Sequence, residues 1–304
     1  MMKNQKIIAI TGPSASGKTK LSVEVAKAIN GEIISVDSRQ IYKELDIGSA
    51  KPTEEERCGI PHYLIDVTDI NKEYTVADFS DEANIKIKEI ILKGKVPILV
   101  GGTGLYFRVL LQDFDLPRVA PNSELRAELD KCSNEELYAK LLKKDELLAN
   151  KIHFNNRVKI IRALEVCYTL GMPMSQAQKK KENPYNVLWY GLNAQNRDYL
   201  YERINNRVDI MFKQGLLNEA KNLFEKYGDN KILLNTIGYQ ELYPYFKNET
   251  DLNSAVALLK QNTRRYAKRQ ISWFNANKSI KWFNIENQKP EYMSASIVAD
   301  YKNM

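Results

Sequence analysis

The chain has 304 residues, 43% of them hydrophobic, which is enough for one large α/β domain or for a core domain with a smaller inserted one. Its formal net charge of +7 favours a polyanionic partner without requiring one. Three widely spaced cysteines without a C-x-x-C pair exclude the usual zinc sites and a disulfide framework, and no apolar stretch approaches the roughly 18 residues that span a bilayer, so we expect buried thiols and a cytoplasmic location.

A phosphate-binding loop follows the first predicted strand. The apolar run Ile7–Ile10 leads into GPSASGKT at Gly12–Thr19, and residues 20–29 then have helical spacing. In a strand, glycine-rich loop and helix of this kind, backbone N–H groups surround phosphate oxygens and the lysine, Lys18, neutralises them. The hydroxyl of Thr19 reaches Mg²⁺ in such loops, so we expect Mg²⁺ as the cofactor.

Strands and helices alternate after this loop. Apolar runs at 31–36, 63–67 and 96–100 predict three further buried strands, and the stretch 75–93 has helical periodicity. This alternation predicts a doubly wound parallel sheet of the P-loop NTPase type, with helices on both faces.

Polar residues stand at the carboxyl ends of three predicted strands. They are the loop 12–19, the segment DSRQ at 37–40 and the segment GGTG at 101–104. Because ligands of such sheets bind outside the carboxyl ends of the strands, we expect the three segments to converge on one crevice.

The usual second carboxylate of a nucleotide-hydrolysing P-loop enzyme is missing after strand 96–100, which ends in glycines. Asp66 is an alternative Mg²⁺ ligand, although we favour a structural role for it. Asp37 stands beside Ser38, Arg39 and Gln40, which suits a general base that faces a substrate. A turn or helix cap is the other interpretation of Asp37.

The pattern changes after residue 117. Residues 118–184 contain no strand-like run and have helical periodicity, which predicts an inserted all-helical domain between the core segments 1–117 and 185–304. Within the insertion, a helix at 157–169 has one apolar and one basic side. A strand at 187–192 returns the chain to the sheet, and everything after 197 is predicted to be helical.

The last long helix, 254–275, carries a cluster of basic residues among aromatic ones. Arg264 and Arg265 lie one turn before Lys268 and Arg269, and like charges at this spacing are mildly destabilising. RNA phosphates would relieve that repulsion, and a solvated basic face is the equal alternative. We expect Trp273 and the following phenylalanine to belong to the core.

Taken in order, the motifs of this chain resemble those of the bacterial-type tRNA dimethylallyltransferases, also called tRNA isopentenyltransferases. The resemblance covers almost the whole chain and implies a P-loop core with a helical insertion. The matching blocks are GPSASGKT at 12–19, DSRQIYKELDIGSAKPT at 37–53, HYLID at 62–66, VGGTGLY at 100–106, RALEV at 162–166, R-x-x-x-R-V-D-x-M at 203–211, IGYQE at 237–241 and KRQISWF at 268–274.

The resemblance implies transfer of a dimethylallyl group from dimethylallyl diphosphate to N6 of adenine 37 in tRNAs that read codons beginning with U. Asp37 would be the general base, Thr103 a hydrogen-bonding partner at the reacting centre, and Arg207, in preference to Arg203, a clamp on the leaving diphosphate. The expected diphosphate ligands are Gly12, Ser14, Ala15, Ser16, Gly17, Lys18 and Thr19, with Mg²⁺ on Thr19.

The expected partners are the tRNA anticodon stem-loop and dimethylallyl diphosphate, bound by a monomer that needs neither a membrane nor a protein partner. Two alternatives share the phosphate-binding loop: a prenyltransferase acting on free adenylate, and a small-molecule P-loop kinase. The expected tRNA contacts are Asp37, Ser38, Arg39, Gln40, Thr103, Arg126, Val158, Lys159, Arg162, Gly238, Tyr239, Gln240, Lys268, Arg269 and Gln270.

Overall fold

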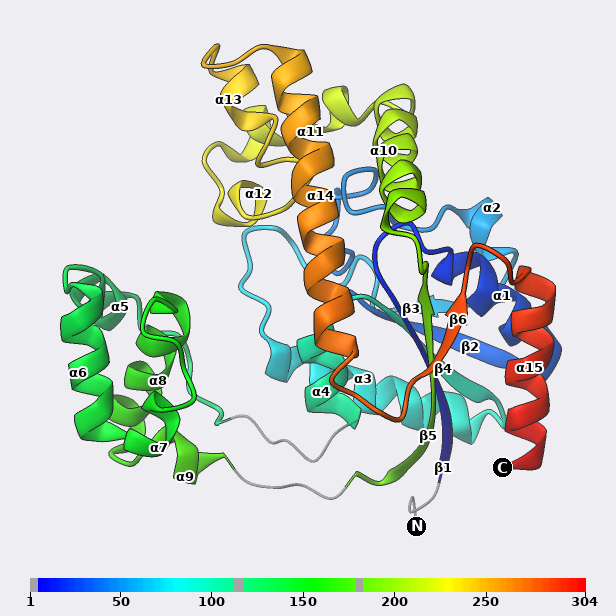
Figure 1. Cartoon of the computed structure of the whole chain (residues 1–304), viewed down its shortest axis with the longest axis horizontal. Coiled ribbons are helices and arrows are strands. Elements are labelled where there is room, and N and C mark those ends of the chain that lie inside the picture. Colours follow the sequence, from blue (N-terminus) through cyan, green and yellow to red (C-terminus); the bar gives the residue numbers. More distant parts are fainter. Residues whose placement is uncertain (1–4, 112–116, 179–182) are drawn as a thin grey trace. The chain divides into compact units, whose positions relative to one another are not determined.

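The computed structural model describes residues 5–111, 117–178 and 183–304 (Figure 1). The described residues form two compact units. One lies within Met1–Leu111 and Pro184–Met304, and the other within Gln112–Asn183. The predicted start of the insertion adjoins residues 112–116, which lie outside the described residues.

A six-stranded sheet with only parallel pairs runs through the first unit, in the order β3-β2-β4-β1-β5-β6. A parallel sheet buried on both faces was predicted, and the fold class is confirmed. The strands are β1 (Gln5–Thr11), β2 (Gly31–Val36), β3 (His62–Tyr63), β4 (Val96–Gly101), β5 (Tyr185–Asn193) and β6 (Lys281–Asn284).

Two predictions about the strands were wrong. The strand predicted at 63–67 is only β3, because Leu64 and Asp66 have left-handed φ angles of 60° and 57°, and the N–H of Val67 donates to the carbonyl of Ile41 at 2.8 Å. Strand β6 lies in a region predicted to be entirely helical. It has four residues and pairs with β5, so its strand character comes from that partner.

Alternate residues of β1 pack on opposite faces of the sheet. Ile7 and Ala9 pack in a cluster with α3 (Val76–Leu92) and α4 (Gly104–Leu111). Ile8 and Ile10 pack in a second cluster with α1 (Lys18–Ile29) and α15 (Pro290–Asn303). Helices therefore cover both faces, as the period-two apolar pattern requires (Figure 1).

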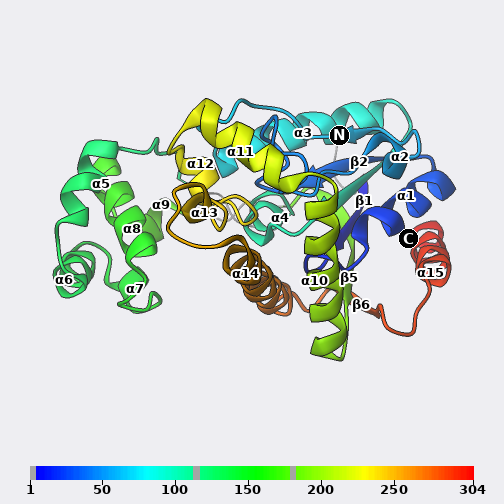
Figure 2. The same ribbon diagram turned by 90° about the horizontal axis from the view of Figure 1, so that it is seen from above.

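Further helices of this unit pack on the loop that follows β2. Ile41, Tyr42 and Leu45 of that loop share an apolar cluster with these helices. Helix α14 was predicted at 254–275 and is confirmed, and Figure 2 shows it beside α10. These helices are α10 (Arg197–Lys213), α11 (Leu216–Tyr227), α12 (Lys231–Leu234), α13 (Tyr243–Phe246) and α14 (Leu252–Phe274). The short helix α2 (Glu54–Arg57) contacts α1 instead.

The second unit is helical in its described residues, as predicted, and has its own apolar core. Leu137, Leu141, Ile160 and Leu164 are fully buried there. Its helices are α5 (Ser123–Asp130), α6 (Asn134–Lys144), α7 (Glu146–Ala149), α8 (Arg157–Leu170) and α9 (Met174–Ala177).

Of the three cysteines only Cys167 is buried, whereas Cys58 is exposed at the end of α2, so the prediction of three buried thiols was wrong.

None of the helices in the described segments has the length and apolar character needed to cross a membrane.

Candidate active site

The loop Gly12–Thr19 connects β1 to α1 and is held closely against β5. Gly12 has a φ of 148°, and a Cβ atom there would lie 2.5 Å from the carbonyl oxygen of Leu192. Only glycine fits this position without moving the neighbouring backbone. The Lys18 Nζ donates to the carbonyl oxygens of Gly12 at 3.0 Å and Pro13 at 2.7 Å. The Lys18 side chain thus lies along the phosphate-binding loop and contacts its first two residues.

The electrostatic surroundings of Lys18 are mixed. Burial, together with the nearby Arg207 guanidinium, lowers the pKa of Lys18 to about 7, while Asp37 acts in the opposite direction. An anion bound in the loop would favour the charged amine. Binding of an anion in the loop would therefore be coupled to protonation of Lys18.

Two arginines of α10 lie one helical turn apart near this loop and have different roles. The Arg203 Nε donates to the carbonyl of Ala15 at 2.9 Å and supports the loop. Among the described residues Arg207 makes no hydrogen bond or ion pair, and burial lowers its pKa while Glu56 and Asp37 counteract the effect. A half-buried guanidinium without a partner suits an anionic ligand, so the preference for Arg207 stays a prediction that this geometry supports.

Asp37 follows β2 and has one carboxylate oxygen engaged. Its Oδ1 accepts hydrogen bonds from the backbone N–H groups of Arg39 at 2.8 Å and Gln40 at 3.3 Å. Within the described part of the chain Oδ2 accepts none. Asp37 therefore acts as a turn cap and still has an oxygen available to accept a proton.

Thr103 joins the ends of β2 and β4. Its N–H donates to the carbonyl of Val36 at 3.2 Å, and its Oγ1 accepts from the N–H of Ser38 at 3.1 Å. The expected convergence of the segments at 37–40 and 101–104 is confirmed by these contacts. Tyr266 of α14 also lies here, where burial and Asp37 raise its pKa to about 12. From the sequence, Tyr266 was only one of the aromatic residues among the basic ones of this helix, because its position beside Asp37 depends on how α14 packs.

Arg39 and Gln40 are partly engaged within the protein. One terminal nitrogen of Arg39 donates to the carbonyl of Asn235 at 3.1 Å. The Gln40 side chain accepts from Ser35 Oγ at 2.9 Å and donates to the carbonyl of Ala50 at 3.0 Å. These bonds fix the segment that carries Asp37.

Several predicted tRNA contacts of the first unit have internal partners in this structure. Tyr239 is fully buried, and its hydroxyl donates to Glu219 at 2.7 Å. Gly238 and Gln240 both donate to the buried carboxylate of Glu241. Contacts of these residues with tRNA stay predictions, whereas their role in holding the fold is visible.

The amide of Gln270 is also used internally. The side chain is 6% exposed, and it connects the N–H of Ser14 with the carbonyl of Gly102. The backbone N–H of Ser14 is therefore engaged and does not point at a diphosphate. The predicted diphosphate donors in this loop are then the Ser14 hydroxyl and the backbone N–H groups that follow it.

Basic and aromatic side chains lie together on α14. Lys268 and Arg269 are exposed, and the Arg269 guanidinium lies 5.6 Å from the centre of the Tyr266 ring. Together with Ser272 and Trp273 they line a shallow pocket. Trp273 is 43% exposed, so its predicted place in the core was wrong, whereas Phe274 is buried as expected.

In the second unit two of the predicted tRNA contacts share one acidic partner. The buried carboxylate of Glu165 accepts from Arg126 Nε at 2.8 Å and from Arg162 Nη1 at 2.5 Å. Val158 is 80% exposed, and Lys159 beside it is also exposed. These last two stand at the start of α8 and are accessible to a partner.

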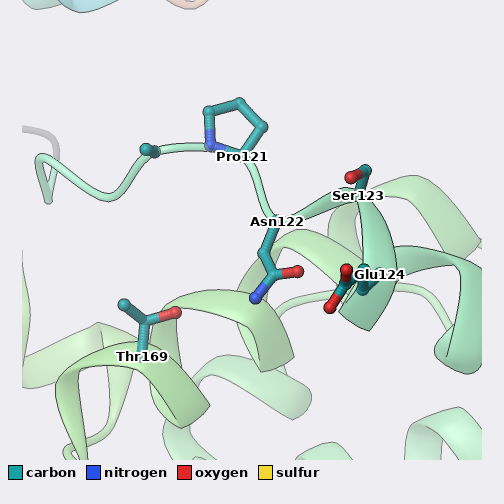
Figure 3. Close-up of a pocket in the computed structure, with 6 residues that line it drawn as sticks. Pro121, Asn122, Ser123, Glu124 and Thr169 are labelled. Carbon is teal, nitrogen blue, oxygen red and sulfur yellow. The ribbon is translucent and has the colours of Figure 1, made fainter.

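This unit also has a shallow pocket (Figure 3). Residues Ala120–Glu124 and Thr169 line it, and the Asn122 side chain caps α5. The capping bond occupies Asn122 Oδ1, which accepts from the N–H of Leu125 at 3.0 Å. The pocket therefore lies at the connection into α5.

Asp66 is an ion-pair partner of Lys51, and its side chain is 46% exposed. This agrees with the structural role favoured from the sequence. In the described segments there is no group of three or more histidine, cysteine, aspartate or glutamate side chains arranged to hold a metal.

A family model described as IPP transferase matches residues 40–277. This range includes Gln40, Thr103, Arg207 and all of α14. This chain belongs to the IPP transferase family. The match begins after the phosphate-binding loop, so the loop and the family model are independent observations.

Relatives of known name extend the IPP transferase assignment over nearly the whole chain. A tRNA dimethylallyltransferase from Enterococcus faecalis is 48% identical over 292 residues, which cover 93% of each chain. A solved tRNA isopentenylpyrophosphate transferase from Staphylococcus epidermidis has a TM-score of 0.73, 39% identity and 99% coverage of both chains. A eukaryotic dimethylallyltransferase whose structure is described as acting on tRNA has a TM-score of 0.84 and 29% identity over 99% of this chain and 79% of its own.

Proposed function

We propose that this protein is a tRNA dimethylallyltransferase that transfers the dimethylallyl group of dimethylallyl diphosphate to N6 of adenine 37 in tRNAs reading codons that begin with U. The names of its relatives support the transferase activity and the tRNA substrate. One observation carries the mechanism: hydrogen bonds connect the phosphate-binding loop to Gly102, and Thr103 to the N–H of Ser38, so the anion site and the base lie at the same edge of the sheet.

The acceptor is a poor nucleophile, because the lone pair of an exocyclic adenine amine is delocalised into the ring. Asp37 Oδ2 accepts a proton from N6 as the bond from N6 to C1 of the dimethylallyl group forms. The bond from C1 to the diphosphate oxygen breaks at the same centre, and diphosphate leaves. The Thr103 hydroxyl, fixed by the N–H of Ser38, offers a second hydrogen-bonding partner for the amine.

The leaving diphosphate acquires charge as the C–O bond breaks. Lys18, Arg207 and the backbone N–H groups from Ala15 to Thr19 stabilise it. Mg²⁺ fits here, because it binds through one or two protein oxygens and several phosphate oxygens, and Thr19 supplies such an oxygen at the start of α1. When bound, Mg²⁺ would neutralise part of the diphosphate charge.

The tRNA is proposed to meet exposed basic groups of each unit, Lys268 and Arg269 in the first and Lys159 in the second. Adenine 37 has to leave the anticodon-loop stack to reach Asp37, as in other enzymes that modify a base. Neutralisation of phosphates by these groups makes the affinity strongly dependent on salt. We also propose a cytoplasmic monomer, which sedimentation of the purified chain would test for its oligomeric state.

A single-turnover assay tests the proposal. The protein is mixed with dimethylallyl diphosphate, Mg²⁺ and an anticodon stem-loop that contains adenine 37, and the product is located by mass spectrometry. Prenylation of N6 supports the proposal. Preferential prenylation of free AMP would favour the adenylate prenyltransferase, and phosphate transfer from ATP without any prenyl transfer would favour the kinase.

A further inference from the structure

The inward side of α14 carries a glutamine that connects two loops of the active site. Gln270 is 6% exposed. Its Oε1 accepts from the N–H of Ser14 at 3.0 Å, and its Nε2 donates to the carbonyl of Gly102 at 3.0 Å. One amide thus satisfies a donor in the phosphate-binding loop and an acceptor in the turn after β4.

The close packing around Gly102 shows that this contact is specific. A Cβ atom at residue 102 would lie 2.1 Å from Gln270 Nε2. Gly102, the second of the two glycines that follow strand 96–100, therefore makes room for the amide of Gln270. The glycine, which the sequence shows, and the buried glutamine, which the fold brings there, belong to one arrangement.

The two loops that Gln270 connects have different roles in the proposed reaction. Ser14 belongs to the loop that receives the diphosphate. Gly102 precedes Thr103, whose Oγ1 accepts from the N–H of Ser38, the residue after Asp37. Gln270 is thus the link between the leaving-group side and the acceptor side of the crevice.

We propose that Gln270 is a positioning residue, which holds the phosphate-binding loop at a fixed distance from Thr103 and Asp37 and so aligns C1 of the donor with N6 of adenine. This inference rests on the proposed function. It assigns Gln270 an internal role in place of the tRNA contact expected from the sequence. A misplacement of reacting groups by about 1 Å costs on the order of 100-fold in rate, so the effect belongs mainly in kcat.

Two substitutions remove the link in different ways. Gln270→Glu keeps the shape and the acceptor for Ser14, but it places a carboxylate oxygen opposite the carbonyl of Gly102. Gln270→Met keeps a similar volume and removes both bonds. Gln261→Met is the control, because Gln261 is an exposed residue of the same helix. Assays are made at a temperature at which all variants are folded.

We expect both Gln270 variants to lower kcat by about 30- to 100-fold while the KM for tRNA changes less than twofold. Gln261→Met should match the parent protein. Parental kcat in either Gln270 variant would overturn the proposal. A raised KM for tRNA with unchanged kcat would overturn it in favour of a direct tRNA contact.

A double substitution separates the hydrogen bonds from simple space filling. Gly102→Ala introduces the clash with Gln270, and adding Gln270→Ala opens space for the new methyl group. We expect the double variant to regain thermal stability relative to Gly102→Ala while kcat stays low. Recovery of kcat together with stability would overturn the positioning role. Absence of prenyl transfer by the parent protein would instead refute the proposed function, which keeps the two failures distinct.

Discussion

The pKa of Lys18 predicts how the affinity for diphosphate depends on pH. In the free protein the pKa of this amine is lowered to about 7 by burial and by Arg207. A bound diphosphate places negative charge beside the amine and raises its pKa toward the usual value near 10.4. The bound state therefore holds more protons than the free state above pH 7, and the affinity must fall as the pH rises.

The magnitude follows from the two protonation states. With a pKa of about 7 in the free protein and a much higher one in the complex, the affinity is divided by 1 plus 10 raised to the power of pH minus 7. This factor is about 1 at pH 6 and about 11 at pH 8. The dissociation constant for inorganic diphosphate should therefore rise about tenfold between these two values.

The assay is calorimetric titration of the protein with inorganic diphosphate at pH 6, 7 and 8, at fixed Mg²⁺ and ionic strength. Lys18→Arg is the matched control, because a guanidinium stays charged across this range. The protonation of diphosphate itself affects both proteins equally and cancels in their ratio. A ratio of dissociation constants that changes less than twofold from pH 6 to pH 8 would refute the reasoning.

Three further predictions concern other parts of the molecule. Asp37→Asn should lower the single-turnover rate about 1,000-fold and leave diphosphate affinity within threefold, because it removes the base but not the anion site; a parental rate would reduce Asp37 to a turn cap. Glu165→Gln should lower the free energy of unfolding of the second unit by about 2–3 kcal/mol in urea titrations, since Arg126 and Arg162 both donate hydrogen bonds to this buried carboxylate, and an unchanged value would contradict that role. Tyr239→Phe should cost about 1 kcal/mol of stability through the lost bond to Glu219 and leave tRNA affinity unchanged. A tenfold weaker affinity for tRNA with unchanged unfolding would support the tRNA contact instead.

Much of the core was predictable because its signals are local. The phosphate-binding loop is eight consecutive residues whose spacing alone places backbone donors around an anion, and the strands before and after it have clear apolar runs. The helices α3, α8 and α14 were located by periodicity. Where a local signal was weak, prediction failed: β6 has four residues and depends on β5, and the third predicted strand is cut short by left-handed residues in the loop after Tyr63.

The sequence by itself determined the sheet class, the phosphate-binding loop, and the candidacy of Asp37 and Thr103, because each of these follows from residues that are neighbours in the chain. Only the tertiary structure decided which side chains hold them in place. Ser14 and Gln270 are separated by 256 positions, and their contact exists only because α14 packs over the ends of β1 and β4. Likewise, helical spacing placed Gln270 and Trp273 on one basic and aromatic helix, but only the packing buried the first and exposed the second. The spacing of residues along a helix follows from the sequence, whereas the burial of each side chain depends on which elements pack against that face of the helix.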